Sequence, residues 1–179
     1  AFMRSFIDFD GKPMASILIL GGDSVIGKAL RDYLGMSHDV TVTTRRERSL
    51  FGEHILFMDA LNPVAANVDF GQFDIIINVI AYSKFDYCRE NSHHARKINI
   101  DFPLYIARNI PDSTRFIQFS TSAVFSCETP LQRADDCSFA RSEYGRQKRE
   151  ADDGVLAVGG EIFRISKVLL STDILGEML

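Results

Sequence analysis

A tyrosine and a lysine four residues apart are the pair in this sequence best suited to proton transfer. Tyr144 and Lys148 stand in a stretch with helical spacing over about 141–153, and residues at i and i+4 lie on one face of a helix. An ammonium beside a phenol favours the phenolate and so lowers the pKa of the tyrosine. Tyr144 can then exchange a proton with an alcohol or a carbonyl near neutral pH. The alternative is a surface pair with no ligand, because this spacing alone is common.

Three hydroxyl side chains precede this pair at the end of a predicted strand. Ser120, Thr121 and Ser122 follow the apolar run that begins at residue 115, and Thr121 lies 23 residues before Tyr144. A hydroxyl group at this place can hydrogen-bond the oxygen of a substrate. Thr121 is the preferred candidate, and Ser122 replaces it if the register differs by one residue.

A glycine turn stands between a predicted strand and a predicted helix near the start of the chain. The segment 17–27 reads Ile-Leu-Ile-Leu-Gly-Gly-Asp-Ser-Val-Ile-Gly, so the pattern is G-x-x-S-x-x-G from Gly21 to Gly27. A glycine turn followed by a helix N-terminus suits the pyrophosphate of a dinucleotide. Ser24 stands where such turns have their middle glycine; its hydroxyl can donate to phosphate, but its Cβ limits backbone approach. The alternative is a turn that merely connects a strand to a helix.

A basic segment follows the second predicted strand, and we expect it to select the cofactor. NAD-selective sites place an acid there for the ribose hydroxyls, whereas an arginine accommodates a 2′-phosphate. Residues 40–46 contain no acid, and the segment includes Arg45 and Arg46. The sequence therefore favours NADP over NAD, with NAD still open. The alternative is a solvated basic turn over 45–48.

Strands that alternate with helices must position these residues. We predict strands at 16–20, 39–43, 55–57, 73–80, 115–120 and 161–165, and helices after the glycine turn, over about 89–109 and over about 141–153. Pro103 is expected to kink or break the second helix. This alternation predicts βαβ units and an α/β fold with a mostly parallel sheet flanked by helices. We expect the domain to be Rossmann-like and doubly wound, with the strand order 3-2-1-4-5-6.

Composition narrows the class of protein. The chain has 179 residues and a net charge of −4, which argues against a nucleic-acid partner. No apolar run approaches the roughly 20 residues of a membrane span. The three cysteines, Cys88, Cys127 and Cys137, have no CxxC spacing and are expected to be bystander thiols in a cytoplasmic protein.

No metal site is expected. Adjacent residues on a helix diverge by about 100°, so His93 and His94 make a poor pair of ligands. The acidic pairs Asp135–Asp136 and Asp152–Asp153 are expected to be solvated in a loop and at a helix end.

Taken in this order and spacing, these motifs resemble those of the extended short-chain dehydrogenases/reductases that act on nucleotide sugars. The resemblance runs from about Ser16 to Leu170, and the Ser-Thr-x-x-Val-Phe segment at 120–125 is most similar to the dTDP-4-dehydrorhamnose reductase branch. It implies that Thr121 polarises the substrate carbonyl, that Tyr144 is the acid/base, and that Lys148 lowers the pKa of Tyr144 and binds the nicotinamide ribose.

The resemblance also implies a set of cofactor-binding residues. The pyrophosphate would be held by Gly21, Ser24, Val25, Ile26 and Gly27, and the 2′-phosphate by Arg45 and Arg46. Asp59 and Ala60 would flank the adenine, and Ile80, Ala81 and Tyr82 would line the middle of the cofactor. Asn99 would support the site from the neighbouring helix.

The expected function is NAD(P)-dependent redox chemistry at a hydroxyl or carbonyl carbon, and the resemblance implies that this carbon belongs to a nucleotide sugar. Reduction, epimerisation and dehydration stay open. We expect residues 1–14 to be a lead-in segment or tag and 15–179 to be a dinucleotide-binding domain whose C-terminal substrate domain is absent or truncated. A homodimer through the helices that carry Asn99 and Tyr144 is implied by the resemblance. The alternatives are a non-catalytic NAD(P)-binding regulatory or structural module and, more weakly, an interaction domain that binds no nucleotide.

Overall fold

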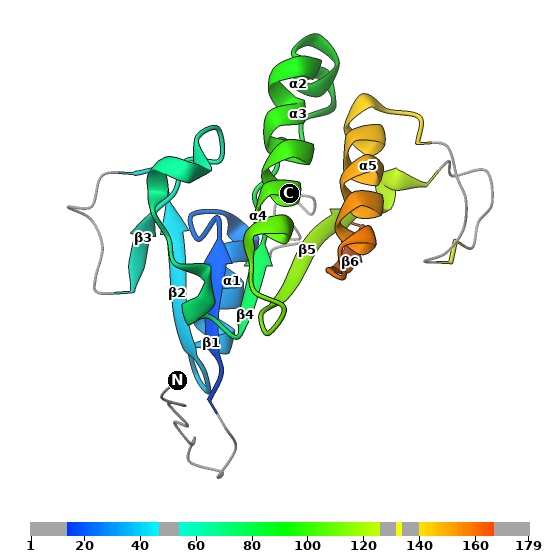
Figure 1. Cartoon of the computed structure of the whole chain (residues 1–179). Coiled ribbons are helices and arrows are strands. Elements are labelled where there is room, and N and C mark those ends of the chain that lie inside the picture. The colour runs from blue at the N-terminus through cyan, green and yellow to red at the C-terminus, as the bar shows by residue number, and fades with distance from the viewer. Residues whose placement is uncertain (1–13, 47–53, 126–131, 134–139, 167–179) are drawn as a thin grey trace, which may run out of the picture.

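The structure, a computed structural model, describes residues 14–46, 54–125, 132–133 and 140–166 (Figure 1). Six strands form one sheet in the order β3-β2-β1-β4-β5-β6, and every neighbouring pair is parallel. The strands are β1 (Ser16–Leu20), β2 (Asp39–Thr44), β3 (Ile55–Phe57), β4 (Ile75–Asn78), β5 (Arg115–Thr121) and β6 (Glu161–Ile165). The predicted Rossmann-like fold and its strand order are confirmed.

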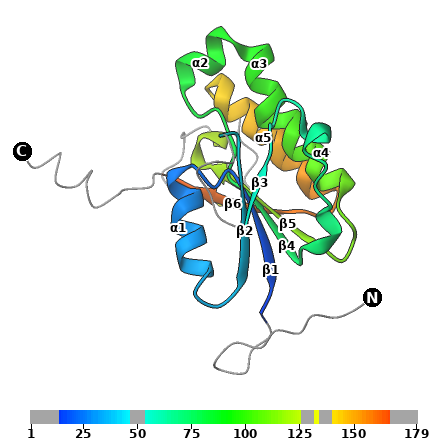
Figure 2. The same cartoon turned by 90° about the vertical axis from the view of Figure 1, so that its left-hand side faces the viewer.

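Helices cover both faces of this sheet, which is why the central strands are apolar on both sides. Helix α1 (Val25–Leu34) lies on one face, and the helices from α2 to α5 lie on the other (Figure 2). In β1, Leu18 and Leu20 join the core cluster of the second face, whereas Ile17 and Ile19 pack with Val42 on the first. The sheet is therefore buried as a layer between two helical layers.

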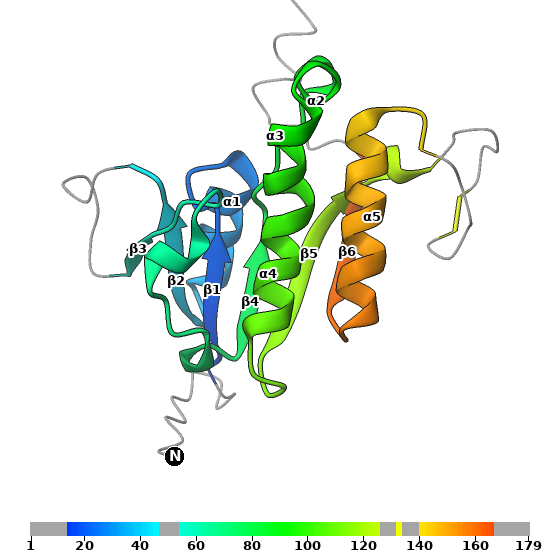
Figure 3. The ribbon, with the colours of Figure 1, turned by 45° about the horizontal axis from the view of Figure 1, so that its top comes forward.

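The helices of the second face run side by side across the sheet (Figure 3). They are α2 (Phe85–Glu90), α3 (Ser92–Arg96), a π-helical turn (Lys97–Asp101), α4 (Phe102–Asn109) and α5 (Glu143–Ala157). Short 3₁₀ turns occur at Pro63–Ala66, Phe70–Gln72 and Ser122–Val124. This layer carries both Asn99 and the Tyr144–Lys148 pair.

The helical stretch predicted over 89–109 differs from the observed one. It begins earlier, at Phe85, and contains a π-helical turn in which the N–H of Phe102 bonds to the carbonyl of Lys97. Pro103 then lies in the first turn of α4. Proline has no N–H and its ring crowds the carbonyl four residues earlier, so the bonding departs from the α-helical pattern in the turn just before Pro103. A π turn is often found at a functional site, and this one contains Asn99.

The carboxyl ends of the strands form the edge at which a ligand would bind. The chain leaves β1 towards β2 on one side and returns to β4 on the other, so a crevice is expected between β1 and β4 at this edge.

None of the helices in the described part of the chain has the length and apolar character needed to span a membrane. The predictions for the lead-in segment, Arg48, Cys127, Cys137, Asp135 and Asp136 lie outside the described residues.

Candidate active site

The turn after β1 has the geometry of a close backbone cradle. Gly21 has φ +97°, and a Cβ there would lie 2.8 Å from Cγ1 of Ile80. A Cβ on Gly27 would lie only 2.3 Å from the carbonyl oxygen of Gly21. Gly21 therefore requires glycine because of its positive φ and its closeness to Ile80, and Gly27 requires it because the turn folds back onto the first turn of α1. The glycine turn predicted from the sequence is present, and it leads directly into the N-terminus of α1.

Ser24 is the N-cap of α1, and this corrects one expectation. Its hydroxyl donates to the carbonyl of Gly21 at 2.8 Å and accepts from the N–H of Gly27 at 3.0 Å. The hydroxyl proton is thus used inside the turn rather than offered to a phosphate. The first N–H groups of a helix have no acceptor within it, so Val25 and Ile26 present the backbone donors at this site.

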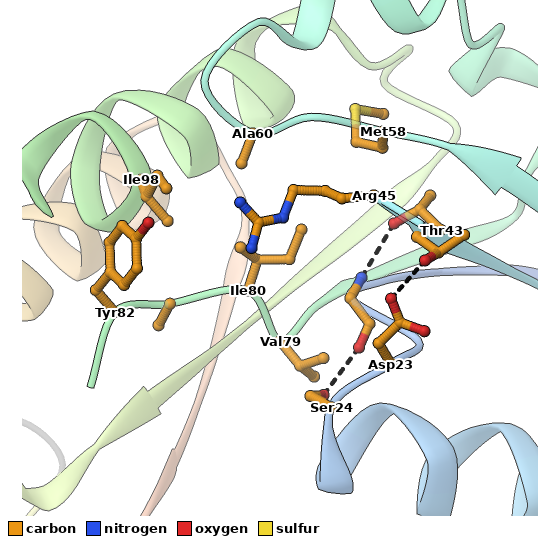
Figure 4. A pocket seen from close by; sticks show the side chains of 13 residues that line it. Asp23, Ser24, Thr43, Arg45, Met58, Ala60, Val79, Ile80, Tyr82 and Ile98 are labelled. Carbon is orange, nitrogen blue, oxygen red and sulfur yellow. Dashed lines mark hydrogen bonds between the residues drawn. The ribbon is translucent and has the colours of Figure 1, made fainter. Parts of the chain in front are cut away.

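A pocket opens above this turn, at the ends of β1, β2 and β4 (Figure 4). The predicted cofactor residues that line it are Gly21, Ser24, Arg45, Ala60, Ile80, Ala81 and Tyr82. Its apolar wall also includes Met58, Val79 and Ile98, which the sequence analysis did not identify. A flat aromatic group can rest on such a wall while its charged part faces the glycine turn.

The charged end of this pocket contains an acid as well as an arginine. Arg45 extends into the pocket between Ala60 and Ile80 (Figure 4). Asp23, which the sequence analysis overlooked, accepts a hydrogen bond from the hydroxyl of Thr44. Arg46 stays at the exposed rim, with its Nε 3.9 Å from Oδ2 of Asp23. Arg45 is therefore placed to meet a ligand anion, and Arg46 faces a carboxylate.

A second hollow adjoins the first and contains the predicted proton-transfer residues. Thr121 and Tyr144 both line it, together with Val25 and Ile26 from the start of α1. The two hollows share Ser24, Val79 and Ala81. The glycine turn therefore lies between a pocket bearing Arg45 and a pocket bearing Tyr144.

The close approach of α5 to the end of β5 explains why Thr121 and Tyr144 meet. Ser142 caps α5 by accepting from the N–H of Gly145 at 3.0 Å. A Cβ on Gly145 would lie 2.2 Å from the carbonyl oxygen of Ala123, so glycine lets the helix touch the turn after β5. Ser122 is exposed at the start of that turn, and the register favours Thr121.

Burial dominates the electrostatics of Tyr144. It raises the pKa of the phenol to about 12, with smaller contributions from the charges of Cys88 and Asp152, whereas a hydrogen bond with Thr121 opposes the shift. The expectation that Lys148 lowers the pKa of Tyr144 is therefore not met in this arrangement. The physical reason is that desolvation of the phenolate outweighs the hydrogen bond that favours it.

Lys148 is turned away from both hollows. Its side chain is fully buried, and Nζ donates to the carbonyl of Phe119 at 2.8 Å. Burial lowers the pKa of Lys148 to about 8, and the charge of Asp152 acts in the opposite direction. The ammonium therefore fastens α5 to β5 in this arrangement.

Asp152 corrects a second expectation, because it is buried rather than solvated. Its exposed fraction is 0%, and its Oδ2 accepts from Ser120 Oγ and Arg164 Nε, each at 2.9 Å. Burial raises the pKa of Asp152, and its hydrogen bonds with Ser120 and Arg164 oppose this. Among the described residues, its Oδ1 is the buried side-chain atom left without a hydrogen-bond partner. One face of α5 thus places Tyr144, Lys148 and Asp152 at successive turns, with decreasing access to solvent.

Asn99 does not line the pocket, but it holds the backbone of a residue that does. It holds the backbone of Tyr82, accepting from its N–H at 2.8 Å and donating to its carbonyl at 3.0 Å, and it also donates to Gln147 of α5 at 2.9 Å. At the start of the same loop, Asn78 accepts from the N–H of Ile80 at 3.0 Å and donates to Gln118 at 2.7 Å. These buried amides set the shape of the 79–82 loop that lines the pocket.

Five predicted residues do not line either hollow: Gly27, Arg46, Asp59, Asn99 and Lys148. Gly27 allows the glycine turn to pack closely against α1, and Asn99 holds the backbone of Tyr82, which does line the first hollow. The carboxylate of Asp59 accepts from the N–H of Leu61 at 3.0 Å and so stabilises the turn after β3. The described residues hold no group of three His, Cys, Asp or Glu suited to a metal ion.

The family follows from a sequence model that covers nearly the whole chain. The model of the RmlD substrate-binding domain family matches residues 14–177. The chain belongs to this family. The resemblance noted from its motifs is thereby confirmed. No curated protein sequence matches the chain.

Solved structures share the fold with this member of the RmlD substrate-binding domain family. A dTDP-4-dehydrorhamnose reductase from Clostridium acetobutylicum is 23% identical, with a TM-score of 0.70 over 90% of this chain and 58% of its own. The enzyme of the same name from Bacillus anthracis, in complex with NADP, is 20% identical, with a TM-score of 0.65 over 87% of this chain and 54% of its own.

A third structure is a short-chain dehydrogenase/reductase superfamily protein from Agrobacterium tumefaciens with bound NAD. It is 16% identical, with a TM-score of 0.69 over 84% of this chain and 47% of its own. The chain thus spans about half of the length of the solved structures that it matches.

Proposed function

We propose that this chain is the dinucleotide-binding part of an NADP-dependent oxidoreductase that acts on a hydroxyl or carbonyl carbon of a nucleotide sugar. The observation that carries the proposal is the pair of hollows joined at Ser24, Val79 and Ala81. One hollow contains the glycine turn and Arg45, and the other contains Thr121 and Tyr144. NADP-bound and NAD-bound members of the fold support this reading.

The residues present fit a dinucleotide. Gly21 and Gly27 leave a cradle that a Cβ would fill, and Val25 and Ile26 offer N–H groups at a helix start. Arg45 would meet a 2′-phosphate in the first hollow, while Ile80, Ala81 and Tyr82 line the path to the second. The bound nicotinamide would supply or accept a hydride at the reacting carbon.

The protein's own contribution is proton transfer and orientation. Thr121 would hydrogen-bond the substrate oxygen, and Tyr144 would exchange a proton with it. With a pKa of about 12, the Tyr144 phenol is protonated at neutral pH. In this state it can donate a proton to the oxygen of a carbonyl that is being reduced. Lys148 would hold α5, and with it Tyr144, against β5 through the hydrogen bond that its Nζ donates to the carbonyl of Phe119.

The first test is binding. We expect NADPH to bind with higher affinity than NADH when each is titrated into the protein and nicotinamide fluorescence is followed; the chain has no tryptophan, so protein emission is weak. Tyr144→Phe should retain NADPH affinity within about twofold, while turnover of a keto sugar nucleotide falls by roughly 10² to 10⁴. Tyr33→Phe, on the exposed side of α1, is the matched control.

The burial of Lys148 and the raised pKa of Tyr144 favour a second candidate, a cofactor-binding module without catalysis. In that case NADPH binds, but no keto sugar is reduced by the wild type and Tyr144→Phe changes nothing. If neither nucleotide binds, both candidates fail and the chain is an interaction domain with this fold.

A homodimer is part of the proposal. The segment that carries Asn99 and helix α5 lie side by side on one face of the sheet (Figure 3), and this layer is the surface through which two copies would pair. Sedimentation equilibrium of the protein should give twice the chain mass of 20.1 kDa. A monomer at micromolar concentration would contradict the dimer and leave the redox proposal intact.

A further inference from the structure

An acid stands at the carboxyl end of β2 although the residues at that end of the strand provide none. Residues 40–46 contain no carboxylate, but Asp23 reaches this place from the glycine turn. Its Oδ2 accepts from the hydroxyl of Thr44, the last residue of β2. Asp23 also lines the same pocket as Arg45 (Figure 4). In space, therefore, the carboxylate occupies the position from which an acid would bind the hydroxyls of an adenosine ribose.

The position of Asp23 is determined by bonds on both sides. The turn is tied to β2 because Gly21 N donates to Thr43 Oγ1 at 3.0 Å and Gly22 N donates to the Thr43 carbonyl at 2.9 Å. Thr44 Oγ1 accepts from the N–H of Arg46 at 3.0 Å, so its own proton is directed to Asp23. The carboxylate is thus held in place by the end of β2.

The carboxylate retains capacity for a ligand. An ionised carboxylate offers about four lone-pair sites, and Thr44 uses one of them. The side chain of Asp23 is 30% exposed towards the pocket, and the Nε of Arg46 is 3.9 Å away, too far for a hydrogen bond. Ribose hydroxyl groups can therefore donate to Asp23, whereas a phosphate group at the same place meets a like charge.

We infer that Asp23 is a specificity-determining residue that favours an unphosphorylated ribose diol and weakens binding of a 2′-phosphate. The inference rests on the proposed function. In one pocket, Asp23 favours binding of NADH and Arg45 favours binding of NADPH. The protein therefore binds NADH as well as NADPH. The preference for NADPH that Arg45 provides is smaller than it would be with a neutral residue at position 23.

The test compares the ratio of the Kd for NADH to the Kd for NADPH between the wild type and the variant Asp23→Asn. Asparagine keeps the shape and an acceptor for Thr44, but removes the charge. We expect the Kd for NADH to rise roughly tenfold, because the ribose hydroxyls would then donate to a neutral amide oxygen, and hydrogen bonds to an ionised acceptor are about twice as strong. We expect the Kd for NADPH to fall severalfold, because like-charge repulsion is relieved. Both constants come from nicotinamide fluorescence, which does not depend on turnover.

Asp32→Asn is the matched control. It makes the same change of charge on α1, where Asp32 is exposed and paired with Arg31, and its ratio of constants should stay within about twofold of wild type. Arg45→Gln should move the ratio the other way, weakening NADPH far more than NADH. Should Asp23→Asn fail to fold, Asp23→Ser keeps an acceptor for Thr44 and serves the same test.

The outcomes separate the two proposals. If both nucleotides bind wild type and Asp23→Asn leaves the ratio unchanged, the assignment of Asp23 is wrong and the proposed function stands. An equal shift in Asp32→Asn would also overturn it, because net charge and not position would then be responsible. If neither nucleotide binds wild type, the proposed function and the role of Asp23 both fail.

Discussion

At the scale of single residues, the site depends on places where a Cβ does not fit. Gly27 has the closest approach of this kind in the glycine turn, because its Cβ would overlap the carbonyl of Gly21 and come within 2.9 Å of Cα of Gly22. Backbone atoms cannot move aside as a flexible side chain can. The turn and the first turn of α1 therefore tolerate no side chain at this position.

Gly27→Ala is predicted to separate the turn from the helix. The expected loss of free energy of unfolding is about 1–3 kcal/mol, as for other overpacking changes, and NADPH affinity should fall at least tenfold. Urea denaturation and nicotinamide fluorescence measure the two effects. Gly71→Ala is the control, since its Cβ would meet no atom closer than 3.3 Å. Equal effects of the two variants would show that the turn has no special role.

Asp152 and Asp153 offer a second comparison between neighbouring residues. Asp152 is buried against Arg164 and Ser120, whereas Asp153 is exposed and pairs with Arg149 at 3.0 Å. Removing one partner of a buried ion pair costs about 3–5 kcal/mol, and an exposed pair contributes about 0–1 kcal/mol.

We therefore predict that Asp152→Asn lowers the free energy of unfolding by about 3 kcal/mol and that Asp153→Asn changes it by less than about 0.5 kcal/mol. Chemical denaturation of both variants under one condition checks this. A loss below about 1 kcal/mol for Asp152→Asn would mean that the buried pair is replaceable by neutral hydrogen bonds.

At the scale of elements, helix α5 carries two residues whose shifted pKa values make the stability of the protein depend on pH. Burial lowers the pKa of Lys148 from 10.5 to about 8 in the folded protein. Between these values the unfolded chain binds more protons than the folded one at this residue, so stability rises with pH. Tyr144 acts in the opposite sense above pH 10, because its folded pKa is raised from 10.0 to about 12. The Lys148 contribution is therefore clearest between about pH 8 and 10.

Lys148→Met is predicted to remove this rise. We expect the difference in free energy of unfolding between wild type and variant to change in favour of wild type as the pH increases from 8 to 10. Urea midpoints measured at half-unit steps give the two curves. Parallel curves would show that Lys148 has an ordinary pKa and hence a more solvated ammonium group. Arg149→Met, at the next position on α5, is the control for charge and helix propensity.

At the scale of the whole molecule, the proposed ligand would join the two halves of the sheet. Residues after β1 and β2 line one hollow, and residues after β5 and from α5 line the other, with the loop after β4 common to both. A ligand that binds only the folded state stabilises it by about 2.7 kcal/mol when present at 100 times its Kd.

We predict that saturating NADPH raises the melting temperature of the protein by roughly 5–10 °C, given about 2–4 °C per kcal/mol for a chain of this size. Thermal unfolding followed by circular dichroism measures this. Adenosine 2′,5′-bisphosphate, which has only the half proposed for the Arg45 pocket, should give a smaller rise. A rise with both that persists in Gly27→Ala would place binding elsewhere.

The sequence by itself determined the fold and the parts of the site that lie close together along the chain. The apolar strands, the glycine turn and the i, i+4 pair of Tyr144 and Lys148 are local patterns with fixed spacing, and the alternation of strands with helices predicts a mostly parallel sheet. The structure confirms the fold, and it brings Thr121 and Tyr144 to one hollow as predicted.

Only the tertiary structure decided which charged side chains lie together near the site and how burial shifts their pKa values. Asp23 reaches the end of β2 through a partner 21 residues away, Lys148 turns to a carbonyl 29 residues away, and Asp152 is buried by Ser120 at a separation of 32. Residues 40–46 gave no sign of this acid, because Asp23 belongs to the glycine turn and meets the end of β2 only in the folded chain. Burial and hydrogen-bond partners set the ionisation of a side chain, and both depend on which distant segments the sheet brings into contact.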